Sequence, residues 1–334
     1  RVSMAEALDR AEAAGGGGGA GGGADERREV VVTMITDDGF LPGVQALGAS
    51  LRRCQVQGKT RTRPLVAMVT HGVSKHTRAK LLRGYVDSLV EVDPIRCPSS
   101  RVTTGGGQDA HVESWNETGY TKLNLWRLGT AELGGWDAAV YVDADAVVLE
   151  SIDPIFERIS PANPLVAAPD IFPPDKFNAG VLGVALDHTG DEFQRLMLKV
   201  GELPTHDGGD TGFLNAFYSD WWCRDAEARL PFRYNAQRTM HWMTYDKQPG
   251  YWEVTRPICI LHFSSSPKPW EAPDRKGEVD MIWWDCFLEG QLRATSGASP
   301  DPRDSSEVRN QDTPSAAAPP ALPSAIAAMA SAFL

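Results

Sequence analysis

Short apolar runs alternate with helix-like repeats along the first half of the chain. The apolar runs are continuous and bounded by polar or turn residues, which predicts buried strands at 30–34, 65–69, 89–92 and 138–142. Between them, apolar residues at helical spacing predict helices over 44–54, from an N-cap at Ser74 to Leu82, and over 121–128. Continuous apolar strands separated by helices indicate an α/β fold, with a mixed, mainly parallel sheet that helices cover on both faces.

Polar side chains follow two of the predicted strands. In sheets of this kind, ligands bind beyond the carboxyl ends of the strands. Thr36 and Asp37 come just after the first strand, and Asp143 and Asp145 follow the strand at 138–142. Carboxylates at i and i+2 share one face of an extended segment, and they could hold a hard cation while leaving room for a diphosphate. This is the DxD arrangement of nucleotide-sugar transferases, although the triplet also fits an acidic turn after a strand.

The amino-acid composition limits which binding partners and which cellular compartment we expect for the protein. The 334 residues are 42 % apolar and carry a net charge of −11 without a long basic block, so we expect no nucleic-acid partner. The five cysteines are scattered and lack C-x-x-C spacing, which fits a reducing compartment. We favour a cytoplasmic location. A Golgi membrane is the alternative if the chain is a fragment with an anchor beyond Leu334, since the apolar stretch 325–334 is too short to span a bilayer.

The two ends of the chain differ in composition from its middle. Residues 1–28 are Ala/Glu-rich and then Gly-rich, and we expect a disordered leader there. Ser, Pro and Ala dominate the end of the chain, so we expect a disordered tail over 293–334. The ordered domain is therefore predicted to span 29–292.

Nine short segments, in order and at compatible spacing, resemble the glycogenin-like members of glycosyltransferase family 8. They are V-T-M-I-T-D-D-G-F (32–40), T-K-L-N-L-W (121–126), Y-V-D-A-D (141–145), I-D-P-I-F (152–156), F-N-A-G-V (177–181), D-G-G-D (207–210), L-P-F-R-Y-N (230–235), H-F…K-P-W (262–270) and I-W-W-D (282–285). The resemblance covers about 30–288. It implies a GT-A fold, which is a Rossmann-like nucleotide-sugar-binding architecture. It also implies a UDP-sugar donor, a manganese ion and transfer with retention of anomeric configuration.

The resemblance assigns the metal and catalytic residues position by position. It implies that Asp143, Asp145 and His262 bind the metal, and this donor set suits manganese better than calcium. His262 alone would also fit a buried core histidine, but its spacing to Lys268-Pro269-Trp270 favours a ligand. The implied catalytic residues are Asp207, Asp210 and Lys268, with Lys268 also contacting a phosphate.

The resemblance likewise implies which residues hold the donor. The residues matched to uracil and ribose contacts are Met34, Thr36, Asp37 and Phe40, and Phe40 would stack on the base. The residues matched to the sugar and phosphates are Lys122, Ala144, Asn178, Ser265 and Lys268.

Three positions depart from the family pattern. Thr211 stands where glutamine is usual, Ser265 replaces a glycine, and the acceptor tyrosine position falls on Trp242. Indole cannot accept a glucosyl group through oxygen, so self-glucosylation is not expected there, although a shifted loop could present Tyr245.

The leading hypothesis is a retaining UDP-sugar hexosyltransferase with UDP-glucose as donor. The alternatives are glucuronosyl transfer to a glycan or sphingolipid headgroup, and a non-catalytic sugar-binding scaffold. We expect the acceptor to be a glycan, a protein tyrosine or a lipid headgroup. The chain could also form a homodimer.

Overall fold

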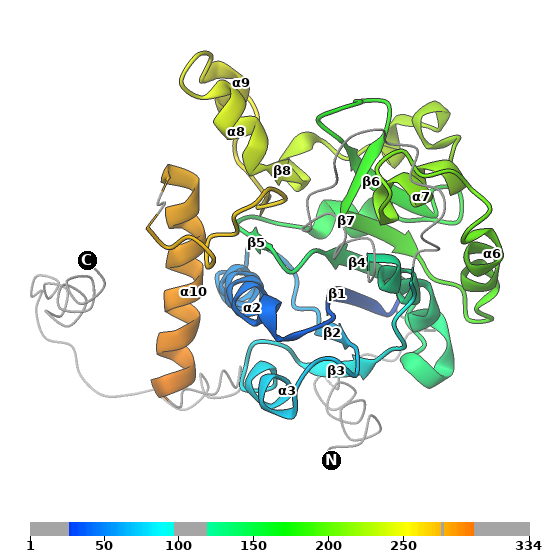
Figure 1. Cartoon of the computed structure of the whole chain (residues 1–334), viewed down its shortest axis with the longest axis horizontal. Coiled ribbons are helices and arrows are strands. Elements are labelled where there is room, and N and C mark those ends of the chain that lie inside the picture. Colours follow the sequence, from blue (N-terminus) through cyan, green and yellow to red (C-terminus); the bar gives the residue numbers. More distant parts are fainter. Residues whose placement is uncertain (1–26, 97–118, 275–276, 297–334) are drawn as a thin grey trace, which may run out of the picture. The chain divides into compact units, whose positions relative to one another are not determined.

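The computed structural model of the chain describes residues 27–96, 119–274 and 277–296 (Figure 1). The predictions of a disordered leader and tail concern residues that lie almost entirely outside these ranges. The last helix, α10 (Glu278–Ser296), continues past the domain boundary that we expected at Leu292. None of the helices within the described ranges is both long and apolar enough to cross a bilayer.

A six-stranded sheet in the order β3-β2-β1-β4-β7-β6 forms the centre of the fold. Its strands are β1 (Glu29–Ile35), β2 (Leu65–Val69), β3 (Ser88–Glu91), β4 (Ala138–Val142), β6 (Leu165–Pro169) and β7 (Phe177–Ala185). The pairs β3–β2, β2–β1 and β1–β4 are parallel, whereas β7 is antiparallel to both β4 and β6. The four strands expected from the apolar runs are present, and the prediction of a mixed, mainly parallel sheet is confirmed.

Both faces of this sheet are covered because alternate side chains of its buried strands point to opposite sides. On one face Val31 and Val140 pack with Leu47 and Leu51 of α2 (Leu41–Val56). The residues expected at helical spacing, Val44, Leu47, Leu51 and Cys54, therefore lie in a helix, and residues 43–51 of this helix are all buried. The helix α10 lies beside α2 (Figure 1).

The opposite face packs against helices from the middle of the chain. Its strand residues Val32 and Tyr141 share a core with Leu123 and Phe213. Leu123 belongs to η2 (Gly119–Gly129), where we expected a helix over 121–128, and it is a 3-10 helix with nine buried residues. Phe213 belongs to α7 (Asp210–Phe217), and α6 (Asp191–Lys199) also lies against η2.

A smaller sheet in the order β5-β9-β8 brings distant segments to the end of β4. Its strands are β5 (Ala146–Val148), β8 (Ala236–Gln237) and β9 (Ile260–His262). In the antiparallel β5–β9 ladder, Ala146 pairs with His262. Because Ala146 directly follows Asp145, this register places the histidine beside the DxD triplet.

The remaining elements are short. The Ser74 hydroxyl accepts a hydrogen bond from the Thr77 N–H and caps α3 (Lys75–Leu81) as predicted. The other helices are α5 (Asp153–Arg158), α8 (Arg238–Thr244) and α9 (Gly250–Glu253), and the other 3-10 turns are η1 (Asp38–Phe40), η3 (Ala131–Leu133), η4 (Trp221–Cys223), η5 (Ala226–Ala228) and η6 (Phe232–Tyr234).

Candidate active site

A cleft opens at the carboxyl ends of β1 and β4, the edge at which ligands bind in α/β sheets. The side chains lining it come from β1, η1, η2, β4, the DxD turn and the start of α7. They are Met34, Ile35, Thr36, Asp37, Phe40, Gly119, Lys122, Tyr141, Asp143, Ala144, Asp145 and Asp210. Most of the residues proposed from sequence for the donor and the metal are therefore brought together in one place.

Three potential metal ligands converge beside this cleft. Asp143, Asp145 and His262 can each direct one ligand atom into a space where these atoms lie within 4.8 Å of one another. His262 Nε2 lies 3.2 Å from Asp145 Oδ1 and 3.8 Å from Asp143 Oδ2. Asp145 and His262 are almost completely buried, so the charge of the Asp145 carboxylate is little screened by solvent.

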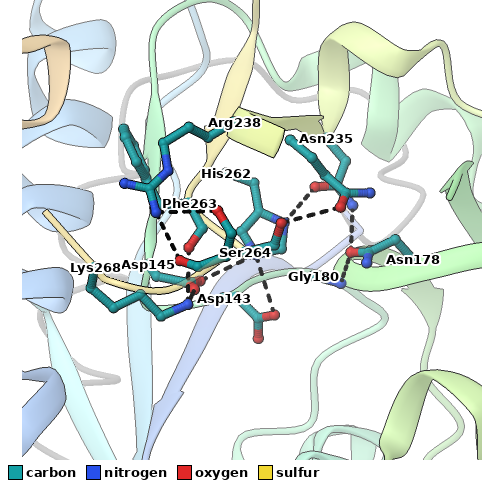
Figure 2. Close-up of polar contacts among 12 residues, drawn as sticks. Asp143, Asp145, Asn178, Gly180, Asn235, Arg238, His262, Phe263, Ser264 and Lys268 are labelled. Carbon is teal, nitrogen blue, oxygen red and sulfur yellow. Dashed lines mark hydrogen bonds and ion pairs between the residues drawn. The ribbon is translucent and has the colours of Figure 1, made fainter. Parts of the chain in front are cut away.

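A chain of amide side chains fixes the orientation of His262 (Figure 2). Asn235 Nδ2 donates to Asn178 Oδ1 at 2.9 Å, which turns the Asn235 oxygen toward the imidazole. His262 Nδ1–H donates to that oxygen at 2.8 Å. The proton therefore resides on Nδ1, and Nε2 carries a lone pair. Metal-binding histidines are typically oriented in this way through the second ring nitrogen.

The Nε2 atom of His262 is buried and finds no hydrogen-bond partner within the described part of the chain. A bare nitrogen lone pair that faces two carboxylates is electrostatically unfavourable. A divalent cation held by these three groups would remove this conflict, and two carboxylate oxygens with one imidazole suit a borderline transition metal. The residues present therefore fit a divalent cation.

Lys268 reaches the same triplet from the loop after β9. Its ammonium donates to Asp145 Oδ2 at 2.6 Å and to the Phe263 carbonyl at 2.9 Å. Burial alone would raise the pKa of Asp145, but the adjacent charge of the Lys268 ammonium outweighs burial and holds that pKa well below its usual range. Asp145 is thus kept ionised, as a metal ligand must be.

A second buried lysine links the triplet to α7. Lys122 Nζ lies 3.1 Å from Asp143 Oδ1 and 2.5 Å from Asp210 Oδ2. Burial opposes the charge on Lys122, yet these two carboxylates raise its pKa above the ordinary value. For Asp143, burial and the neighbouring acids Asp145 and Asp210 outweigh the attraction of Lys122 and raise the pKa. Lys122 therefore fixes Asp210 beside the cleft as a charged, buried pair.

Several residues proposed from sequence lie outside the cleft lining. Asp207 Oδ1 accepts hydrogen bonds from the Gly209 and Gly212 N–H groups at 2.8 and 2.9 Å, which orders the turn that begins α7. Ser265 bonds to Arg238 through its carbonyl and hydroxyl, and Asn178 bonds to Asn235. Contacts of these three residues with a donor stay predictions.

The unusual Thr211 has a structural contact. Its hydroxyl accepts a hydrogen bond from the Ala179 N–H at 3.2 Å and joins α7 to β7. Among the donor-site candidates, Asp37 caps η1 by accepting from the Gly39 N–H at 2.7 Å. Phe40 contacts Trp270 edge to face at 5.6 Å.

Asp170 is a site residue that the sequence reasoning missed. It directly follows β6, whose direction matches that of β4 because both are antiparallel to β7. Its carboxylate accepts from Gln237 Nε2 at 2.9 Å and from Asn178 Nδ2 at 3.4 Å, so it supports the amide chain that orients His262. The strand-end rule that pointed to Asp143 would also have found Asp170.

Gly180 is a second missed residue, and it is required by close packing. A Cβ atom at this position would lie 2.2 Å from His262 Cε1 and 2.6 Å from Nδ1. We expect Gly180→Ala to push the imidazole off Asn235 and to weaken Mn²⁺ binding about 10- to 100-fold, the usual cost of disturbing the groups that orient a ligand. Isothermal titration with Mn²⁺ measures this.

Gly48→Ala is the matched control for this variant. Its Cβ would lie 2.1 Å from the Tyr85 carbonyl oxygen, so it is equally crowded but touches no candidate ligand. We expect a lowered thermal midpoint in both variants and weakened Mn²⁺ binding in Gly180→Ala alone. Equal Mn²⁺ affinity in Gly180→Ala and wild type would contradict the placement of His262.

Comparisons with known proteins agree with this geometry. A model of the family described as "Glycosyl transferase family 8" matches residues 31–273. Glycogenin-1 of Homo sapiens is 31 % identical over 280 residues, which cover 78 % of this chain and 72 % of that protein. Inositol phosphorylceramide glucuronosyltransferase 1 of Arabidopsis thaliana is 25 % identical over 279 residues, covering 77 % of this chain and 43 % of that protein.

A solved structure shares the fold. The glycosyltransferase GlyE of Streptococcus pneumoniae TIGR4 superposes with a TM-score of 0.53 at 18 % identity, covering 81 % of this chain and 64 % of that one. The GT-A architecture expected from the sequence is thereby confirmed.

Proposed function

The chain belongs to glycosyltransferase family 8, and from this premise we propose that it is a manganese-dependent, retaining hexosyltransferase that uses UDP-glucose. The observation that supports the proposal most is the convergence of Asp143, Asp145 and the buried Nε2 of His262 beside a cleft at the carboxyl edge of the sheet. When bound there, a divalent cation would neutralise the diphosphate of the leaving UDP.

The side chains of the cleft have separate proposed tasks. Phe40 would stack on uracil, and Met34, Thr36 and Asp37 would contact the nucleoside, since all four line the cleft at the carboxyl end of β1. Lys268, next to Asp145, would hold a phosphate oxygen and stabilise the charge that grows on UDP as the glycosidic bond breaks.

The opposite wall of the cleft would hold the sugar. Asp210 lines the cleft and forms an ion pair with Lys122, so its carboxylate could accept hydrogen bonds from sugar hydroxyls and stabilise positive charge at the reacting carbon. Asp207 shapes the turn before it, and Asn178 would contact the sugar from β7.

The charges of the cleft favour a neutral hexose over glucuronic acid. Lys122 is the only cation among the lining residues that the structure describes, and it already pairs with Asp143 and Asp210. A C6 carboxylate would therefore meet an acidic wall. Glucuronosyl transfer stays the second candidate because of the similarity to the Arabidopsis glucuronosyltransferase.

An external acceptor fits the chain better than one of its own residues. Trp242 has no oxygen to receive a glucosyl group. Tyr245 directly follows α8, and its ring stacks on that of His241 in α8 with 4.3 Å between the ring centroids. This contact holds the Tyr245 side chain against α8. We therefore propose a glycan, a protein tyrosine or a lipid headgroup as the acceptor.

A donor-hydrolysis screen tests the proposal. Purified protein is incubated with Mn²⁺ and UDP-glucose, UDP-galactose or UDP-glucuronic acid, and released UDP is measured with and without EDTA. We expect EDTA-sensitive hydrolysis that is fastest with UDP-glucose. Faster hydrolysis of UDP-glucuronic acid would favour the second candidate, and no release of UDP from any donor would contradict the proposed function.

A further inference from the structure

Arg238, the first residue of α8, is a charged side chain that is only 2 % exposed, and it lies outside the cleft lining. Its guanidinium donates to Asp280 Oδ1 at 2.7 Å. Asp280 is itself buried and lies in the first turn of α10, where its second oxygen accepts from the Gly277 N–H at 3.2 Å. The pair therefore joins α8 to the start of α10.

The other contacts of Arg238 are with the loop between β9 and Lys268. Nη2 donates to the Ser265 carbonyl at 2.8 Å, the Ser265 hydroxyl at 3.2 Å and the Pro267 carbonyl at 2.7 Å. The guanidinium carbon also lies 4.1 Å from the Trp242 ring centroid and 5.3 Å from that of Phe263. One guanidinium nitrogen thus binds the carbonyl groups at both ends of the Ser265–Pro267 segment (Figure 2 shows Arg238 beside this loop).

We propose that Arg238, held by Asp280, is a positioning residue that fixes the loop at 264–267 so that the Lys268 ammonium is aimed at Asp145 and at the donor phosphates. The inference rests on the proposed function, because it assigns Lys268 to the diphosphate. Arg238 itself touches neither the cleft nor the candidate metal ligands.

The directional contacts of Arg238 favour this role over simple stabilisation. Buried ion pairs are a poor source of stability, since apolar residues of similar volume often serve as well. A rigid guanidinium fork instead specifies where each of its acceptors must lie. The Lys268 ammonium reaches Asp145 at 2.6 Å from a backbone that is held by the preceding loop and by a hydrogen bond from its own N–H to Glu271 Oε2. Displacing a catalytic group by about 1 Å can cost about 100-fold in rate.

A double-mutant cycle between Arg238 and Lys268 tests the proposal. The variants are Arg238→Met, Lys268→Ala and the double variant, and the measurements are the Kd of UDP with Mn²⁺ and kcat and KM for UDP-glucose hydrolysis. If Arg238 acts through Lys268, we expect Arg238→Met to lower kcat about 10- to 100-fold. Lys268→Ala should then cost much less in the Arg238→Met background than in wild type.

Arg63→Met is the matched control. Arg63 is also buried, bonds to Glu29 Oε2 at 2.7 Å and forms an ion pair with Asp153. Glu29 is the first residue of β1, whereas the cleft is at the other end of that strand, so this pair is at the opposite edge of the sheet. We expect a lower thermal midpoint in both arginine variants and a kcat loss in Arg238→Met alone.

A conservative variant of Asp280 tests how much of the effect depends on its ion pair with Arg238. Asp280→Asn keeps the side-chain volume near Arg238 but weakens the ion pair, so we expect a smaller kcat loss of the same kind. Equal losses from Lys268→Ala in both backgrounds, or equal kcat in Arg238→Met and Arg63→Met, would overturn the positioning role while leaving the proposed function intact. No UDP binding by the wild-type protein would overturn both.

Discussion

Replacing Asp145 with asparagine is expected to lower manganese-dependent hydrolysis of the donor by at least about 100-fold, because a neutral amide is a poor substitute for a charged oxygen ligand. Asp145 contacts two of the charged or metal-binding side chains of the site. Its carboxylate lies 3.2 Å from His262 Nε2 and 2.6 Å from Lys268 Nζ. The measurements are the rate of UDP release and the Mn²⁺ affinity by isothermal titration.

This variant also leaves the buried Lys268 ammonium without its carboxylate, and breaking such a pair typically costs about 3–5 kcal/mol. The thermal midpoint of each variant must therefore be measured, and activity must be assayed at a temperature below the unfolding transition. Asp153→Asn is the matched control, since Asp153 pairs with the buried Arg63 away from the cleft. We expect it to lose stability but to keep its turnover. Full manganese-dependent turnover in Asp145→Asn would contradict the DxD assignment.

Lys268→Ala is expected to reduce kcat roughly 30- to 1000-fold, with a smaller change in KM for the donor. Lys268 is 2 % exposed, and its ammonium is held by Asp145 and the Phe263 carbonyl. A charge fixed in this way would strengthen its contact with UDP as the glycosidic bond breaks, and such an interaction acts on kcat more than on binding. Steady-state kinetics of UDP release gives both constants.

Two further variants show whether this effect depends on the charge at that point. Lys268→Arg keeps a cation and is expected to recover part of the rate. Lys59→Ala removes a lysine whose ion pair with Glu150 is well exposed, and should leave kcat unchanged. If Lys268→Ala has wild-type kcat and KM, the assignment of Lys268 to the phosphate is wrong.

Local sequence patterns were sufficient to predict four of the six strands of the central sheet and the position of the DxD triplet. Strands such as 65–69 and 138–142 consist of continuous apolar residues because both faces of the sheet are covered. Buried strands of this kind can therefore be recognised from the sequence as uninterrupted apolar runs. Asp143 and Asp145 could be placed at the ligand-binding edge because they directly follow such a strand. His262 could be assigned only through the resemblance, since its own surroundings fit a core histidine equally well.

Contacts between residues far apart in the chain were decided by the tertiary structure alone. The β5–β9 register brings His262 beside Asp145, and Asn235 then fixes the protonated nitrogen of the imidazole. Arg238 likewise meets Asp280 and the Ser265–Pro267 backbone across a large sequence separation. Hydrogen bonds of this kind depend on a few atoms and on the packing of whole elements. They leave no periodic pattern in the sequence, because neither partner is specified by its neighbours in the chain.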